Sequence, residues 1–63
     1  MKIAVVGAGF VGEATGRGFI KHKHPVVFID TSKNKVKALR NQNFEAYLPQ
    51  EYDKLTTDIT MFS

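Results

Sequence analysis

An apolar run that leads directly into a glycine-rich turn constrains this chain more than any other feature. Residues 2–6 read KIAVV, and residues 7–12 read GAGFVG. An uninterrupted apolar run of this length is typical of a strand that is buried on both faces of a parallel sheet. A strand followed by G-x-G-x-x-G and then a helix is the sequence form of a nucleotide-binding unit.

Each glycine of the turn has its own physical reason in such a unit. Gly7 permits a tight turn out of the strand, and Gly9 has no Cβ, so a pyrophosphate can approach the backbone. Gly12 lets the following helix lie close to the strand. The helix begins with unpaired N–H groups and the positive end of its dipole, which together favour bound phosphate.

The surroundings of the motif agree with this interpretation. A strand precedes it, residues 10–21 can form the following helix, and a second apolar strand at residues 26–29 ends in Asp30. The interval from Gly12 to Asp30 is close to the ~20 residues at which an acidic residue is expected in dinucleotide-binding units. The alternative is a glycine-rich structural turn in some other α/β protein.

The sequence predicts an α/β chain that forms a partial Rossmann fold, β-α-β-α-β, with a parallel sheet in the strand order 3-2-1. Residues 44–53 are expected to be a loop with one short helical turn, because Pro49 interrupts any regular element. Another element begins at residue 59. The expected strands span residues 2–6, 26–29 and 55–58, and the expected helices span residues 10–21 and 33–41.

The spacing of small and apolar residues predicts which helix faces are buried. In the second helix, Val36 and Leu39 should face the sheet, with Lys33, Lys37 and Arg40 toward solvent. Gly16 and Gly18 each cost the first helix about 1 kcal/mol relative to alanine, unless they permit another element to pack closely. The predicted inward positions of the first helix are Val11, Ala14, Thr15, Gly18 and Phe19.

Composition excludes several classes of site. The 63 residues contain no cysteine and only two histidines, which argues against disulfides and against a metal site. The net charge of +3 comes without interleaved aromatic residues, so we expect no nucleic-acid surface. No apolar run approaches the ~20 residues of a membrane span, and no signal peptide precedes the first strand. We therefore expect a cytoplasmic protein without a membrane partner.

The small size of the chain predicts that it needs additional packing. A domain of this length buries only about 60% of its unfolded surface. The order 3-2-1 would also leave the apolar first strand at a bare edge, and such an edge invites pairing. We expect residues 1–63 to be the N-terminal half of a dinucleotide-binding domain. The chain would self-associate through the first-strand edge, or be a truncated or proteolysed part of a longer protein.

Asp30 bears on the choice of cofactor. An acid at the end of the second strand accepts hydrogen bonds from the adenosine ribose hydroxyls and repels a 2′-phosphate, which favours NAD over NADP. Lys33 and Lys35 follow closely, and a nearby cation could tolerate the extra phosphate, so NADP stays open. The competing interpretation is that Asp30 only caps the following helix or turn.

These stretches resemble the amino-terminal end of the UDP-glucose/GDP-mannose dehydrogenase family. The resemblance rests on residues 1–12, on VFID at residues 27–30 followed by KVKAL at residues 35–39, and on LTTD at residues 55–58. It implies NAD-dependent oxidation of a nucleotide-sugar alcohol to a uronic acid, with Val11, Asp30 and Lys35 in contact with NAD. The candidate cofactor-binding residues are Gly7, Gly9, Phe10, Val11, Gly12, Asp30 and Lys35.

The resemblance assigns no catalytic residue to this chain, because the catalytic cysteine and lysine of the family lie downstream of the matching part. The chain alone is expected to bind NAD without catalysing a reaction, and to meet a nucleotide-sugar substrate only within a full-length enzyme. Two alternatives remain: the cofactor-binding part of a hydroxyacid or phosphogluconate-type dehydrogenase, and a non-catalytic Rossmann-like binding or assembly module. The sequence does not identify the substrate.

Overall fold

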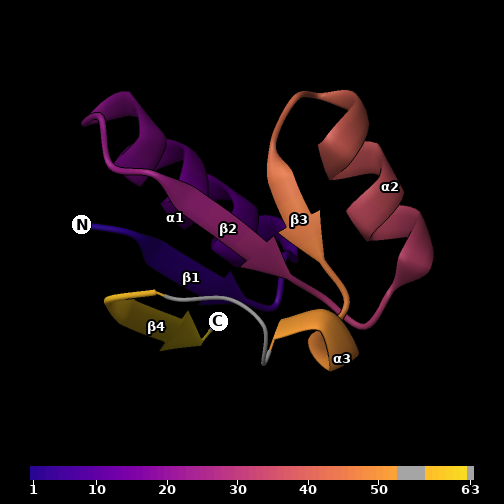
Figure 1. Cartoon of the computed structure of the whole chain (residues 1–63). Coiled ribbons are helices and arrows are strands. Elements are labelled where there is room, and N and C mark those ends of the chain that lie inside the picture. Colours follow the sequence, from indigo (N-terminus) through magenta and orange to yellow (C-terminus); the bar gives the residue numbers. More distant parts are fainter. Residues whose placement is uncertain (53–56, 63) are drawn as a thin grey trace.

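The computed structural model describes residues 1–52 and 57–62, which form one parallel sheet with helices on both faces. Figure 1 shows the strands side by side in the order β3-β2-β1-β4. This arrangement confirms the predicted α/β class with a parallel sheet. The strands are β1 (Ile3–Val6), β2 (Val26–Ile29), β3 (Glu45–Tyr47) and β4 (Ile59–Phe62), and the helices are α1 (Phe10–Lys21), α2 (Lys33–Asn41) and α3 (Pro49–Tyr52).

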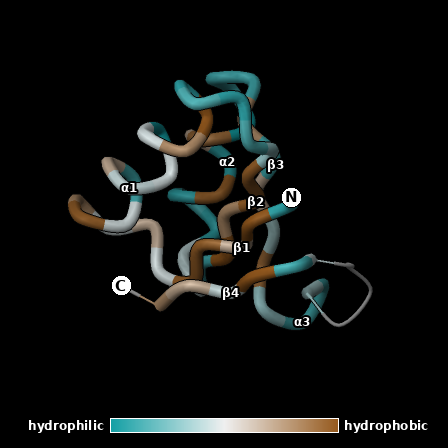
Figure 2. Tube along the Cα trace, turned by 90° about the vertical axis from the view of Figure 1, so that its left-hand side faces the viewer, coloured by the Kyte–Doolittle hydropathy of each residue, from teal (hydrophilic) through white to brown (hydrophobic). Residues whose placement is uncertain are grey.

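The two interior strands are the two apolar runs of the sequence. Every residue of β2 is buried, as are the first three residues of β1. The hydropathy trace in Figure 2 shows α1 and α2 on one side of the strands and α3 on the other. Both faces of the interior strands are therefore covered, which is why these strands are continuously apolar rather than alternating.

The predicted order 3-2-1 is found within the observed order β3-β2-β1-β4, but the predicted position of the third strand was wrong. The strand beside β2 is β3, from the stretch expected to be a loop, while the expected helical turn is present as α3. β3 has only three residues, and Pro49 does not end an element but opens α3, where its missing N–H costs nothing. Residues 55 and 56 of the expected strand lie outside the described part of the chain, and Thr57 and Asp58 are not in a strand.

The predicted bare edge on β1 was also wrong. β4 pairs along the whole of β1, with Ile3 opposite Ile59 and Val6 opposite Phe62. Asp58 fixes this pairing, because its Oδ2 accepts the Lys2 amide at 2.7 Å while its own amide donates to the Lys2 carbonyl at 2.9 Å. Self-association through the first-strand edge therefore has no structural basis, since that edge is already paired.

The core lies between the sheet and the helix pair α1 and α2. Phe28 is fully buried at its centre, and the Phe44 ring meets it edge-on with 5.7 Å between ring centroids. Val36 and Leu39 face this core from α2, as predicted. A second, smaller cluster on the opposite face joins Ala4, Val27 and Ile29 to partly buried Tyr52 of α3 and its neighbours. No helix in the described part of the chain is long and apolar enough to cross a membrane.

α1 makes its closest approach to the sheet through glycine, while Phe19 and Ile20 pack against the core as partly buried side chains. The buried residues of α1 are Gly12 and Gly16, and a Cβ on Gly16 would stand 2.3 Å from Cε1 of Phe28. Gly16 thus permits β2 to pack closely against α1, which was one of the two possibilities considered for the helix glycines. Gly18 has no such role, because a Cβ there would meet nothing within 4 Å. Of the predicted inward positions, Thr15 and Phe19 are half-buried, but Val11, Ala14 and Gly18 are exposed.

Both long helices end in the same way. After α1, Lys23 adopts a left-handed conformation (φ 66°), and the amides of Lys23 and His24 donate to the Ile20 and Phe19 carbonyls. After α2, Asn43 (φ 68°) repeats this pattern. Each is a Schellman motif, which satisfies the last carbonyls of the helix and turns the chain toward the next strand.

Candidate functional site

The candidate site lies at the carboxyl ends of β1 and β2, where the glycine-rich turn follows β1. The chain adds β2 and β3 on one side of β1, then crosses to add β4 on the other side. Ligands of open α/β sheets bind outside the carboxyl ends of the strands at such a reversal of strand order. The glycine-rich turn, residues 7–12, therefore begins at the position where a ligand is expected.

Gly7 makes the turn out of β1 as predicted. Its φ of 92° is in the left-handed region that glycine adopts without strain. Its amide donates to the Ile29 carbonyl at 2.7 Å, which ties the turn to the end of β2.

Gly9 is not required by the fold. Its φ of −72° and ψ of −169° are available to any residue, and a Cβ built there would meet no protein atom within 4 Å. Neither backbone conformation nor packing thus explains glycine at this position. The open space beside Gly9 leaves room for a group outside the protein to approach the backbone, as a cofactor diphosphate does in dinucleotide-binding units.

The amino end of α1 presents backbone donors at the same place. Glu13 donates the first hydrogen bond of the helix, to the Gly9 carbonyl at 2.9 Å, so the amides of Phe10, Val11 and Gly12 precede the helical pattern. Gly9 supplies no side-chain cap. Phe10 and Val11 are 91% and 68% exposed, so their side chains take no part in the packed core.

Asp30 joins the end of β2 to the glycine-rich turn. Its Oδ2 accepts the Ala8 amide at 2.8 Å, and its Oδ1 accepts the Ser32 amide at 2.8 Å. Asp30 therefore has the turn role of the competing interpretation, while Ser32 is the cap of α2, and Asp30 also lies beside the glycine-rich turn, as a ribose-binding acid must. Each carboxylate oxygen accepts one of these bonds and retains capacity for another, so the two roles are compatible.

Beside Asp30 lies a hollow of about 150 Å³. It brings together the ends of β1 and β2 with the first residue of α3. The residues that line it are Val6, Gly7, Ile29, Asp30, Thr31 and Pro49. Sequence reasoning missed Thr31 and Pro49 as site residues, because only the pairing of β3 with β2 brings Pro49 to this edge.

Lys35 lies in the first turn of α2 and is half-buried. Its amide donates to Oγ of Ser32 at 3.2 Å, and the Ser32 amide in turn donates to Asp30. Lys35 is thus connected to Asp30 through the helix cap.

The remaining titratable residues considered from the sequence lie elsewhere. Glu13 pairs with Arg17 at 3.0 Å on the surface of α1, and His22 and His24 follow the opposite end of that helix from the turn. Residues 1–52 and 57–62 contain no group of three His, Asp or Glu side chains that could hold a metal ion.

Comparison with known proteins agrees with this geometry. No curated protein and no solved structure matches the chain. A family model described as the NAD binding domain of the UDP-glucose/GDP-mannose dehydrogenase family matches residues 1–61. The cofactor of this domain is NAD, and the family consists of NAD-dependent dehydrogenases. Because the match covers nearly every residue, the chain belongs to the UDP-glucose/GDP-mannose dehydrogenase family, and the matching region is the NAD binding domain.

Proposed function

We propose that this chain holds NAD at the carboxyl edge of β1 and β2, as the cofactor-binding part of a nucleotide-sugar 6-dehydrogenase. The observation that carries the proposal is Gly9, where neither φ nor packing demands glycine. A diphosphate over the turn gives that position a physical reason. The family match favours this function over a hydroxyacid or phosphogluconate-type dehydrogenase and over a non-catalytic module.

Each candidate residue has a distinct role in this proposal. The amides of Gly9, Phe10, Val11 and Gly12 bind the diphosphate, with the dipole of α1 adding to the attraction. Gly7 shapes the turn through its left-handed φ.

On the adenosine side, the Asp30 carboxylate accepts hydrogen bonds from the ribose hydroxyls. Lys35, in the first turn of α2, contacts the same ribose in this proposal. Bound NAD supplies the hydride acceptor for oxidation of the sugar alcohol, and no residue of this chain is proposed to act on the substrate itself.

Asp30 also sets the preference for NAD over NADP in this proposal. The 2′-phosphate of NADP would lie next to the Asp30 carboxylate, and the two negative charges would repel each other. The same carboxylate strengthens the bonds from the ribose hydroxyls, because hydrogen bonds to charged groups contribute about 1.5–3 kcal/mol.

Calorimetric titration with NAD and with NADP tests the proposal in the Asp30→Asn variant. Asparagine keeps a carbonyl oxygen for one of the backbone amides but removes the charge, so NAD binding should weaken by about 10- to 100-fold. The preference for NAD over NADP should shrink in the same variant. The matched control is Glu45→Gln, which removes an equal charge at the amino end of β3, at the opposite edge of the sheet.

The control should bind NAD as the wild type does. A folded Asp30→Asn variant with wild-type affinity for NAD would contradict the ribose contact. A folded wild-type chain without NAD binding would overturn the proposed function.

A further inference from the structure

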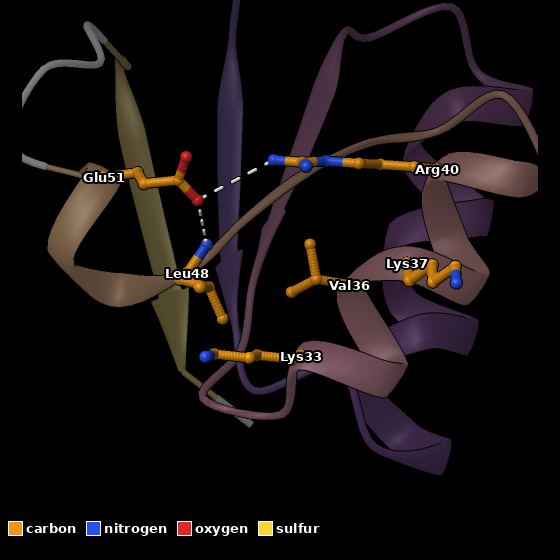
Figure 3. Close-up of a pocket in the computed structure, with 6 residues that line it drawn as sticks. All are labelled: Lys33, Val36, Lys37, Arg40, Leu48 and Glu51. Atoms are coloured by element: carbon orange, nitrogen blue, oxygen red, sulfur yellow. Dashed lines mark hydrogen bonds and ion pairs between the residues drawn. The ribbon is translucent and has the colours of Figure 1, made fainter.

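A groove between α2 and α3 is separate from the hollow beside Asp30 and larger than it. Its volume is about 280 Å³. Figure 3 shows Arg40 and Lys33 projecting from α2 toward α3, with Val36 between them and Leu48 opposite. We call it the α2–α3 groove, and its lining residues are Lys33, Val36, Lys37, Arg40, Leu48 and Glu51.

The floor of the groove is apolar and its rim is positively charged. Val36 is buried and Leu48 is half-buried on the floor, while Lys33, Lys37 and Arg40 are exposed. Glu51 is the one acid of the lining, and its Oε1 is already engaged by Arg40 at 3.7 Å and by the Leu48 amide at 2.9 Å. Three cations against one committed carboxylate leave the groove with a net positive charge.

Lys33 and Lys37 stand four residues apart on α2, where like charges repel. Within residues 1–52 and 57–62, neither ammonium has a carboxylate within ion-pair distance. The first turn of α2 also contains no acid. An acidic group in the groove would therefore relieve repulsion as well as form new pairs.

Two features indicate what kind of occupant fits. Arg40 donates from Nε to the Ala46 carbonyl at 2.8 Å, which caps the edge strand β3 and argues against addition of another strand there. The volume lies just below the about 300–1,000 Å³ of pockets that enclose small ligands. A shallow groove of this size suits one apolar side chain that projects from a longer segment.

We infer that the α2–α3 groove docks an acidic peptide segment of another protein, with one apolar side chain on the Val36 and Leu48 floor. Carboxylates that flank this side chain would pair with Lys33 and Lys37 on the rim. This inference concerns a surface outside the NAD site and stands independently of the proposed function.

A second copy of this chain is a poor occupant, because the chain has a net charge of +3 and two copies repel each other. Its described carboxylates also have at least one partner within the chain. Each accepts a hydrogen bond or an ion pair from a neighbour in the same molecule. These residues are Glu13, Asp30, Glu45, Glu51 and Asp58. Charge complementarity therefore points to a foreign acidic segment.

Fluorescence anisotropy of the full chain with a labelled, capped peptide tests the inference. The probe carries one leucine flanked on each side by two glutamates, and its controls replace the leucine by glycine or the glutamates by glutamines. We expect saturable binding of the probe alone, lost near 1 M salt, where the screening length falls to about 3 Å. The Lys33→Gln/Lys37→Gln variant should weaken binding by about tenfold, as expected for two exposed ion pairs.

The matched variant is Lys21→Gln/Lys23→Gln, which removes two exposed lysines at the end of α1 and should bind the probe as the wild type does. Both variants are also titrated with NAD, and neither should change NAD affinity. This measurement separates a failure of peptide docking from a failure of the proposed NAD binding. Equal weakening in both variants would overturn the inference. Binding of anionic vesicles or of ADP that depends on Lys33 and Lys37, without binding of the peptide, would overturn it too.

Discussion

A methyl group added to Gly16 should destabilise the protein, although alanine is the better helix former. The new Cβ would stand 2.3 Å from Cε1 and 2.4 Å from Cζ of Phe28, whereas ordinary contact begins at 3.4 Å. The ring would have to retreat by about 1.1 Å. It is fully buried and already meets the Phe44 ring edge-on, so the core offers it no space.

The magnitude follows from two opposing effects. Overpacking of a core costs about 1–3 kcal/mol, while the change from glycine to alanine returns about 1 kcal/mol of helix propensity. The new Cβ would clash with two atoms of a buried ring, so the cost should lie in the upper part of this range, at about 2–3 kcal/mol. After the propensity gain, we expect a net loss of about 1–2 kcal/mol for Gly16→Ala. In a domain of this size each kcal/mol shifts Tm by about 4–8 °C, so the melting temperature should fall by roughly 5–15 °C.

Gly18→Ala is the matched control on the same helix. A Cβ at Gly18 would meet nothing within 4 Å, so only the propensity gain remains, and Tm should rise by a few degrees. Thermal unfolding followed by circular dichroism measures both variants. In a Phe28→Leu background, which lacks the clashing ring atoms, the cost of Gly16→Ala should shrink. A Tm for Gly16→Ala at or above that of the wild type would refute the close approach of α1 to β2.

Two further predictions concern the ends of the helices. Lys23→Gly should stabilise the protein by about 0.5–1 kcal/mol in chemical denaturation, because Lys23 occupies a left-handed conformation that glycine adopts without strain. Asn43→Gly should gain less, since asparagine tolerates that conformation, and an equal or larger gain would contradict this reason. Ser32→Ala should cost about 1 kcal/mol of stability, because the Ser32 hydroxyl accepts the Lys35 amide at the start of α2. An unchanged denaturation midpoint would show that this cap contributes nothing.

The parts of the fold that the sequence predicts well are those with a strong local signal. β2, α1 and α2 begin and end at the predicted residues, because apolar runs, a serine cap and polar stops mark them. The glycine-rich turn and Asp30 were also found from spacing, and the structure brings them within hydrogen-bond distance through Ala8.

The errors have tertiary causes. β3 is too short to show a pattern, and its place in the sheet depends on pairing with β2. The inward face of α1 was predicted only in part, because Phe19 packs against the core but Gly16, which allows the helix to approach Phe28, carries no apolar signal. The edge of β1 was mispredicted because the residues after position 58 pair with it as β4. The α2–α3 groove likewise depends on α3, which the sequence only suggested.

The most direct test of cofactor binding at the glycine-rich turn is calorimetric titration of the Gly9→Ala variant with NAD, alongside its thermal unfolding. Because the backbone at Gly9 accepts alanine and its Cβ would meet no protein atom, Tm without cofactor should stay close to that of the wild type. NAD affinity should fall by about 10- to 100-fold, since the methyl group takes the space of the diphosphate. Wild-type affinity in the folded variant would contradict the claim that a diphosphate lies against the backbone at Gly9.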